Sequence, residues 1–219
     1  MKKLLVSLSM FSIFLGVNAQ TSSDPGAKKI LDGVSTKFKT FKAVQAGFTL
    51  KVEDGKGKVQ GVQQGTVNMK GQKYKVNIGG KESKEIFSDG SNTWTYDKAA
   101  NEVTISKVDA SASSITPQKL FTNFYDKDFL YKLNGEKKVG AKTVQEIEMT
   151  PTDKTKTFHK VYVMVDKAAQ TLYSTVVLDK NGNKYTYTVN NINGKAVVSD
   201  GVFIFDQKKY PGVEVVDLR

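Results

Sequence analysis

From residue 43 almost to its end, the chain consists of short segments in which apolar and polar residues alternate, separated by turns of a few residues. Alternation with a period of two is typical of half-buried β-strands. Turns such as Asp89-Gly90 and Asn181-Gly182 have hairpin chemistry. Because parallel strands need crossovers of about a dozen residues, this spacing predicts successive antiparallel strands. We predict strands near residues 43–52, 58–70, 72–79, 83–88, 91–96, 101–106, 129–135, 143–150, 157–166, 171–179, 183–191, 197–205 and 213–217.

Helices are predicted at two places. Asp24 and Pro25 are typical of an N-cap and a first helical position, and helical spacing of apolar residues follows them. These apolar residues are Ile30, Leu31, Val34, Phe38 and Phe41. The run of predicted strands is interrupted once, by a loop-like stretch at 109–115. Thr116-Pro117 follows it and predicts the start of a second, short helix.

About a dozen antiparallel strands in one sheet have to curl. We therefore predict a mainly β (α+β) fold, an incomplete antiparallel β-barrel of about 11–12 strands with a helical lid over an apolar cavity. The candidate lid residues are Val34, Phe38, Leu120, Phe121 and Phe124. The candidate cavity residues are Phe48, Leu50, Val67, Met69, Tyr74, Val76, Ile86, Trp94 and Tyr96. For each of them singly, a place in a solid core is the alternative.

The N-terminus has the order of a secretory signal peptide. Lys2-Lys3 form a charged start, residues 4–17 an apolar middle, and the run ends on small Ala19. We expect cleavage after Ala19, which leaves residues 20–219 as a single domain in the periplasm. An uncleaved anchor is the alternative, but serines interrupt the run and it is shorter than the roughly 20 apolar residues that span a bilayer.

The side chains available for catalysis are few. The 219 residues contain no cysteine and one histidine, His159, which falls in a strand pattern where alternate residues face water. Asp89-Gly90 fits an ordinary turn, and the glycines at 55–58 lack the spacing of a phosphate-binding loop. We therefore expect no catalytic residues, no metal site and no cofactor, and a protein that is not an enzyme.

The formal net charge of +11 raises the possibility of an anionic partner. Lysine carries almost all of it, because the only arginine is the last residue, Arg219. Base and phosphate recognition in nucleic acids favours arginine, so we expect no nucleic-acid partner. Lysines spread along a sheet are typical of a solvated face, and they can also attract anionic headgroups or an acidic partner.

Three stretches carry a resemblance to a known family. Residues 87–96 hold a Ser-Asp-Gly turn followed by a Trp-x-Tyr strand, and residues 41–49 form a first strand after an N-terminal helix. Residues 203–217 hold a Phe-x-Phe segment followed by Pro-Gly-Val and a closing Val-Val-Asp run. In this order and behind a signal peptide, these stretches resemble the periplasmic outer-membrane lipoprotein carrier family, LolA, over about residues 24–217.

The resemblance implies a monomeric carrier that shields the acyl chains of lipoproteins in its cavity. It implies as partners acylated lipoproteins, an inner-membrane ATP-driven lipoprotein-releasing complex and an outer-membrane acceptor. One position departs from the family. Many members have an arginine near Lys70-Gly71 that couples lid closure to cargo release, and this sequence has Gly71 there. Lid gating by that arginine is therefore not carried over.

Two other binding functions remain open on the same fold. One is a carrier of free lipid or glycolipid, and the other is an envelope protein that senses or binds a partner through a peptide or acylated terminus. An enzyme would require a pair of carboxylates converging in the cavity, and the spacing of the acidic residues does not indicate one.

Overall fold

The computed structural model describes residues 23–80, 83–108 and 128–219, and within them the strands form one sheet of 12 strands. The strands are β1 (Val44–Glu53), β2 (Val59–Lys70), β3 (Lys73–Ile78), β4 (Lys84–Ser88), β5 (Asn92–Asp97), β6 (Glu102–Lys107), β7 (Phe129–Val139), β8 (Lys142–Pro151), β9 (Phe158–Asp166), β10 (Thr171–Asp179), β11 (Lys184–Asn193) and β12 (Glu214–Asp217).

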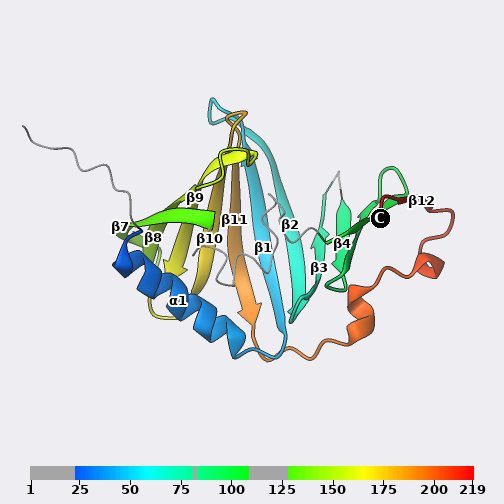
Figure 1. The fold of residues 1–219 in the computed structure, drawn as a ribbon, viewed down its shortest axis with the longest axis horizontal. Coiled ribbons are helices and arrows are strands. Elements are labelled where there is room, and N and C mark those ends of the chain that lie inside the picture. Colours follow the sequence, from blue (N-terminus) through cyan, green and yellow to red (C-terminus); the bar gives the residue numbers. More distant parts are fainter. Residues whose placement is uncertain (1–22, 81–82, 109–127) are drawn as a thin grey trace, which may run out of the picture.

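The sheet is two antiparallel meanders joined along one seam. Strands β1 to β6 form one meander and β7 to β11 the other, and β1 pairs with β11 between them. The order β12-β6-β5-β4-β3-β2-β1-β11-β10-β9-β8-β7 places β12 and β7 at the two ends of the sheet without pairing them, so the sheet is bent but not closed (Figure 1). The prediction of an incomplete antiparallel barrel is confirmed.

The last strand differs from the predicted meander. β12 pairs with β6 in parallel, with Val215 opposite Val103. β7 to β11 lie between β6 and β12 in the chain, so no short turn joins the two strands and the pair is not held to the antiparallel arrangement of a hairpin. Figure 1 shows the segment between β11 and β12 running along the lower edge of the sheet to its far side.

The predicted strand at 197–205 is wrong. This stretch contains a 3₁₀ helix, η1 (Asp200–Phe203), and a second one, η2 (Gln207–Lys209), follows it. Asp200-Gly201 interrupts the apolar alternation, and the helical turn brings Phe203 to a fully buried position. The apolar spacing therefore reflects a covering segment and not a strand.

Helix α1 (Pro25–Lys39) forms where the sequence predicts it. The Asp24 carboxylate caps it by accepting hydrogen bonds from the backbone N–H groups of Gly26 and Ala27, at 2.7 and 3.3 Å. Its other oxygen accepts from the backbone N–H of Leu133 in β7, at 3.1 Å. One side chain thus caps the helix and fixes its first turn to the edge of the sheet.

Some predictions concern residues outside the described ranges. They are the signal peptide at 1–19 and the second helix with Leu120, Phe121 and Phe124. No helix in the part of the chain that the structure describes is both long enough and apolar enough to cross a bilayer.

Candidate functional site

We call the face of the sheet on which α1 packs the inner face. Its strand register carries a continuous layer of apolar side chains across the first meander. Val67 of β2 stands opposite Ala46 of β1 and Val76 of β3, and Val76 stands opposite Ile86 of β4. Because residues opposite one another point to the same face, these side chains form one surface.

The same layer continues onto the second meander. Ile147 of β8 stands opposite Leu133 of β7 and Val163 of β9, and Val163 stands opposite Thr175 of β10. The buried members of this half that sequence reasoning did not select are Phe129, Tyr131, Ile147, Met149, Phe158, Val161, Val163, Val165 and Leu172. The same period-two alternation of apolar residues in β7 to β10 could have identified them.

Most of the predicted cavity residues lie on this inner-face layer. Val67, Met69, Tyr74 and Val76 are buried in it, and Phe48 and Ile86 are half-buried against it. Leu50 points to the same side, two residues after Phe48, and is also buried. Of the predicted lid residues, Val34 is buried in the layer and Phe38 is packed against it.

Trp94 and Tyr96 lie on the opposite, outer face. Trp94 stands opposite Phe87 of β4, whereas the inner-face residue Ile86 stands opposite Thr95. The prediction that these two rings line the same apolar surface as Met69 and Val76 is wrong. The reason is that β4 carries apolar residues on both faces, so alternation alone does not show which face continues the layer.

The outer face has its own aromatic cluster, which we call the outer cluster. Tyr96, Val103 and Val213 are buried there, with Trp94, Phe205 and Tyr210 packed against them. The Phe205 and Tyr210 rings stack with centroids 4.5 Å apart. The Tyr210 hydroxyl donates to Glu85 at 3.0 Å, and burial with this carboxylate raises the pKa of Tyr210. The C-terminal segment is therefore a fixed cover over β4 to β6.

The margin of the inner-face layer is aromatic and half-buried. The Phe48 ring lies over Gly65 of β2, so closely that a Cβ on Gly65 would fall 2.2 Å from Cζ of Phe48. The ring also approaches Tyr187 of β11, with centroids 6.2 Å apart. Burial raises the pKa of Tyr187. This edge of the layer depends on a glycine that leaves room for a ring.

One polar group lies within the layer without a partner. Thr175 is fully buried, and its hydroxyl has no hydrogen-bond partner among the residues that the structure describes. It stands between Val163 of β9 and Tyr187 of β11. Burying a hydroxyl in this way costs free energy, so this position of the layer is not optimised for stability.

A small pocket lies between the C-terminal half of α1, the β9–β10 turn and the end of β11. Its walls are mainly apolar, and Lys37 closes one side by donating from Nζ to the carbonyl oxygen of Ala169 at 2.5 Å. The pocket is partly open to solvent and has a volume of about 10 Å³, room for about one water molecule. Its lining residues are Val34, Lys37, Phe38, Phe41, Gln170, Thr171, Leu172 and Ile192.

Two further predicted positions have structural explanations. Gly71 lies in the turn between β2 and β3 with a φ of 57°, a conformation that favours glycine over the arginine expected from the family. His159 is exposed on β9. Across residues 23–80, 83–108 and 128–219, no group of three or more His, Asp or Glu side chains is placed to hold a metal ion.

An open, bent sheet with a helix across an apolar inner face defines a half-barrel of the kind that can enclose an apolar ligand. Residues 39–206 match the family model described as "Outer membrane lipoprotein carrier protein LolA". The chain belongs to this family, as the resemblance of its three stretches predicted.

A curated relative agrees along the whole chain. An "Outer-membrane lipoprotein carrier protein" of Actinobacillus pleuropneumoniae serotype 3 (strain JL03) is 24% identical over 100% of this chain and 95% of its own length. Among solved structures, an uncharacterized conserved protein from Thermus thermophilus has a TM-score of 0.59 at 15% identity, covering 88% of this chain and 99% of that one. MucB has a TM-score of 0.50 at 12% identity, covering 88% of this chain and 66% of MucB. The similarity to both structures is one of fold.

Proposed function

We propose that this protein is a periplasmic carrier that holds the acyl chains of lipoproteins against its inner-face layer and moves them from the inner to the outer membrane. The observation that carries the proposal is the extent of the layer. α1 packs on β7 and β10, whereas the layer continues across the seam onto β1 to β4. Membership of the carrier family and the name of the curated relative support the same cargo.

The layer suits a ligand that has to be released again. Each buried methylene contributes about 0.8 kcal/mol, so an acyl chain of about sixteen carbons represents roughly 12 kcal/mol of gross transfer free energy. A closely fitting pocket would trap such a chain. Half-buried Phe48, Ile78 and Ile86 instead offer a surface that can repack.

In the proposed cycle, loading separates α1 from the layer and release restores that contact. The N-terminus of α1 is fixed to β7 through Asp24, so the C-terminal half with Val34 and Phe38 is the part that moves. Leu120, Phe121 and Phe124 complete the proposed lid. The proposed acyl-binding residues are Phe48, Leu50, Val67, Met69, Tyr74, Val76 and Ile86, without Trp94 and Tyr96.

The remaining parts of the proposal follow from the family. A signal peptide cleaved after Ala19 delivers the chain to the periplasm as a single monomeric domain. An inner-membrane ATP-driven complex loads it, and an outer-membrane acceptor receives the lipoprotein. The protein uses no cofactor and catalyses no reaction.

A matched pair of variants on β1 tests the acyl-binding surface. Phe48→Asp places a charge on the inner-face layer, and Thr49→Asp places the same charge on the other side of the strand. We expect Phe48→Asp to weaken binding of a fluorescent triacylated lipopeptide at least tenfold and Thr49→Asp to leave it within about twofold. Circular dichroism confirms that both variants keep the sheet. Equal binding by Phe48→Asp and the unchanged protein would contradict the proposal.

The lid and the cargo are tested separately. Leu120→Glu or Phe124→Glu should abolish lipopeptide loading while the sheet stays folded, and unchanged loading would remove these residues from the lid. Native mass spectrometry of residues 20–219 isolated from the periplasm identifies the natural cargo. Acylated protein in the complex supports a lipoprotein carrier, whereas free lipid alone would replace lipoprotein by lipid as the cargo.

A further inference from the structure

One end of the sheet gathers lysines that the acyl-binding proposal does not use. It is the end at which α1 finishes, β1 begins, β11 finishes and the β2–β3 turn lies, along the lower edge in Figure 1. An isolated parallel bridge between Ala43 and Lys195 holds the chain before β1 beside the chain after β11. We call this surface the lysine end and define it by Lys37, Lys39, Lys42, Lys70, Lys73 and Lys195.

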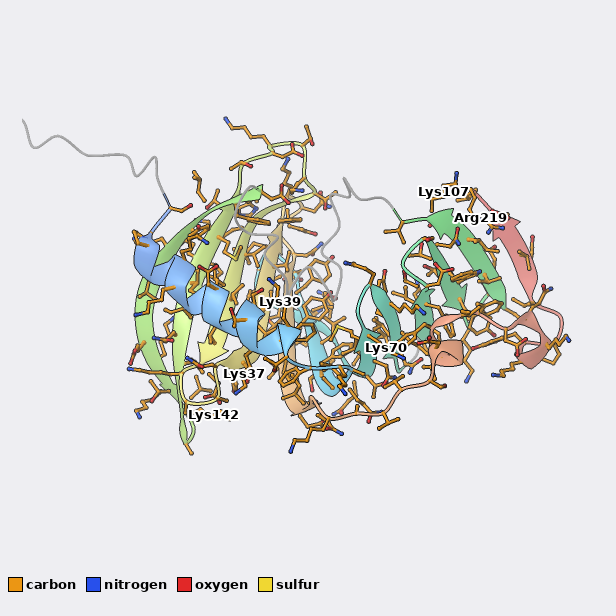
Figure 2. The ribbon with its side chains drawn as sticks, turned by 60° about the horizontal axis from the view of Figure 1, so that its bottom comes forward. Lys37, Lys39, Lys70, Lys107, Lys142 and Arg219 are labelled. Carbon is orange, nitrogen blue, oxygen red and sulfur yellow. The ribbon has the colours of Figure 1, made fainter. Side chains whose placement is uncertain are left out.

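Figure 2 shows Lys37 and Lys39 on the C-terminal half of α1 and Lys70 near the β2–β3 turn. Elsewhere on the sheet, carboxylates pair with several of the lysines, as in Lys142–Asp166 and Lys167–Glu136. At the lysine end, cations outnumber the carboxylates that the sequence places beside them.

The excess of positive charge is visible in sequence and in space. The two segments that build the centre of this end, residues 33–45 and 191–199, contain four lysines and no aspartate or glutamate. Lys42 and Lys195 are placed toward solvent there. Asp200 bridges Lys70 and Lys73 at 2.9 and 3.4 Å, and these lysines lower its pKa, so it stays ionised. One carboxylate shared by two lysines leaves the surface cationic.

An apolar contact lies within this cationic surface. The side chain of Val197, two residues after Lys195, is 101% exposed, the largest exposure of any large apolar residue described. The pocket lined by Phe38, Phe41 and Ile192 also lies at this end, beside Lys37. Cationic side chains around an exposed apolar residue are the pattern of a protein that rests on a lipid surface.

We propose that the lysine end docks the protein on anionic phospholipid bilayers, with Lys42 and Lys195 at the headgroup phosphates and Val197 in the interface. Lysine favours this partner over an acidic protein site, because a flexible ammonium acts as a point charge, whereas planar carboxylate recognition favours the arginine fork. Docked in this way, the protein turns the movable end of α1 toward the membrane. The inference does not depend on which cargo the inner-face layer holds.

Vesicle co-sedimentation tests the proposal. The full mature chain is mixed with vesicles of phosphatidylglycerol and phosphatidylcholine in equal parts, or with vesicles of phosphatidylcholine alone, at low salt. We expect binding to the anionic vesicles only, and loss of that binding when salt is raised to about 0.5 M, because the Debye length then shortens to about 4 Å. Equal binding to both kinds of vesicle would overturn the proposal.

Matched variants locate the surface. Lys42→Gln/Lys195→Gln should weaken vesicle binding by about 25-fold, since each lysine near an anionic surface is worth about fivefold. The control Lys56→Gln/Lys98→Gln removes the same charge from exposed positions elsewhere and should change binding less than about twofold. Val197→Ser should weaken binding a few-fold. If both double variants behave alike, net charge and not the lysine end is responsible, and the proposal fails.

Two further readouts separate the alternatives. Binding of soluble polyglutamate that exceeds vesicle binding, and that Lys42→Gln/Lys195→Gln abolishes, would replace the bilayer by an acidic protein partner. Lipopeptide binding in solution by the same double variant should equal that of the unchanged protein. Its loss would show that the substitution disturbs the inner face and would overturn a separate docking surface.

Discussion

The inner-face layer and the outer cluster use apolar residues in opposite ways. The outer cluster is small and aromatic, and it is closed by fixed contacts, among them stacked Phe205 and Tyr210 and the hydrogen bond to Glu85. The inner-face layer is broad and mostly aliphatic, and its helix is held by Asp24 at one end and by a hydrogen bond from Lys37 to Ala169 near the other. The first is a permanent cover, and the second is a surface whose cover can be displaced.

This difference explains why the apolar side of the sheet changes along its length. On β5 and β6 the inner face carries hydroxyl residues, and Thr93 and Ser106 bond to each other at 2.7 Å. The apolar residues of the same strands point outward to the C-terminal segment. The inner-face layer is thereby confined to β1–β4 and β7–β11, where α1 and the proposed lid can cover it.

The largest effect should come from the C-terminal segment. Phe203→Ala removes a fully buried ring and should lower the free energy of unfolding by about 3–5 kcal/mol. Phe48→Ala, at the half-buried margin of the inner-face layer, should cost about half as much. Urea unfolding of the two variants measures the contrast. If Phe48→Ala lost more free energy of unfolding than Phe203→Ala, the C-terminal segment would not be the more permanent of the two covers.

A smaller effect should follow from releasing the fixed end of α1. Asp24→Ala should cost about 1–2 kcal/mol, and Asp24→Asn, which keeps an acceptor for the cap, should cost less. The backbone N–H of Leu133, followed by those of Gly26 and Ala27, lowers the pKa of Asp24. A carboxyl group whose pKa is lower in the folded than in the unfolded protein stabilises the fold at pH values above its ordinary pKa of 3.8. This stabilisation is lost as the pH falls through the pKa of the folded state.

Urea titrations at neutral pH and at about pH 3 check this dependence. The difference between the unchanged protein and Asp24→Ala should shrink at the lower pH. A difference that stays constant would show that the Asp24 charge does not hold the helix to β7.

The smallest expected effect is a gain in stability. Thr175→Val replaces the unpartnered buried hydroxyl of the inner-face layer by a methyl group and should raise the free energy of unfolding by about 1 kcal/mol. Thr49→Val is the control, because its hydroxyl bonds to Asn190 at 3.2 Å and its removal should bring no gain. Thermal unfolding compares the two. A loss of stability in Thr175→Val would mean that the hydroxyl has a partner in the folded protein.

Helical spacing after a capping residue was enough to predict α1, and period-two alternation with turn chemistry was enough to predict nearly all of the strands and the open sheet. It was not enough to predict which face of each strand belongs to which cluster. Ile86 and Phe87 are adjacent apolar residues on β4, and only the register shows that Ile86 joins the inner-face layer. Phe87 lies on the outer face, where its ring contacts Phe205 of the outer cluster. The strand predicted at 197–205 is wrong for a similar reason. Phe203 and Phe205 are spaced like strand residues, but they belong to a segment that covers the sheet.

The seam between β1 and β11 has a consequence for how the protein folds. Residues that meet there, such as Gly47 and Asn191, are 144 positions apart in the chain. Each meander can form from neighbouring hairpins, whereas the seam has to wait for a long loop to close. We therefore expect two partly folded halves to precede the native sheet, and joining of the seam to set the rate at which the complete inner face appears.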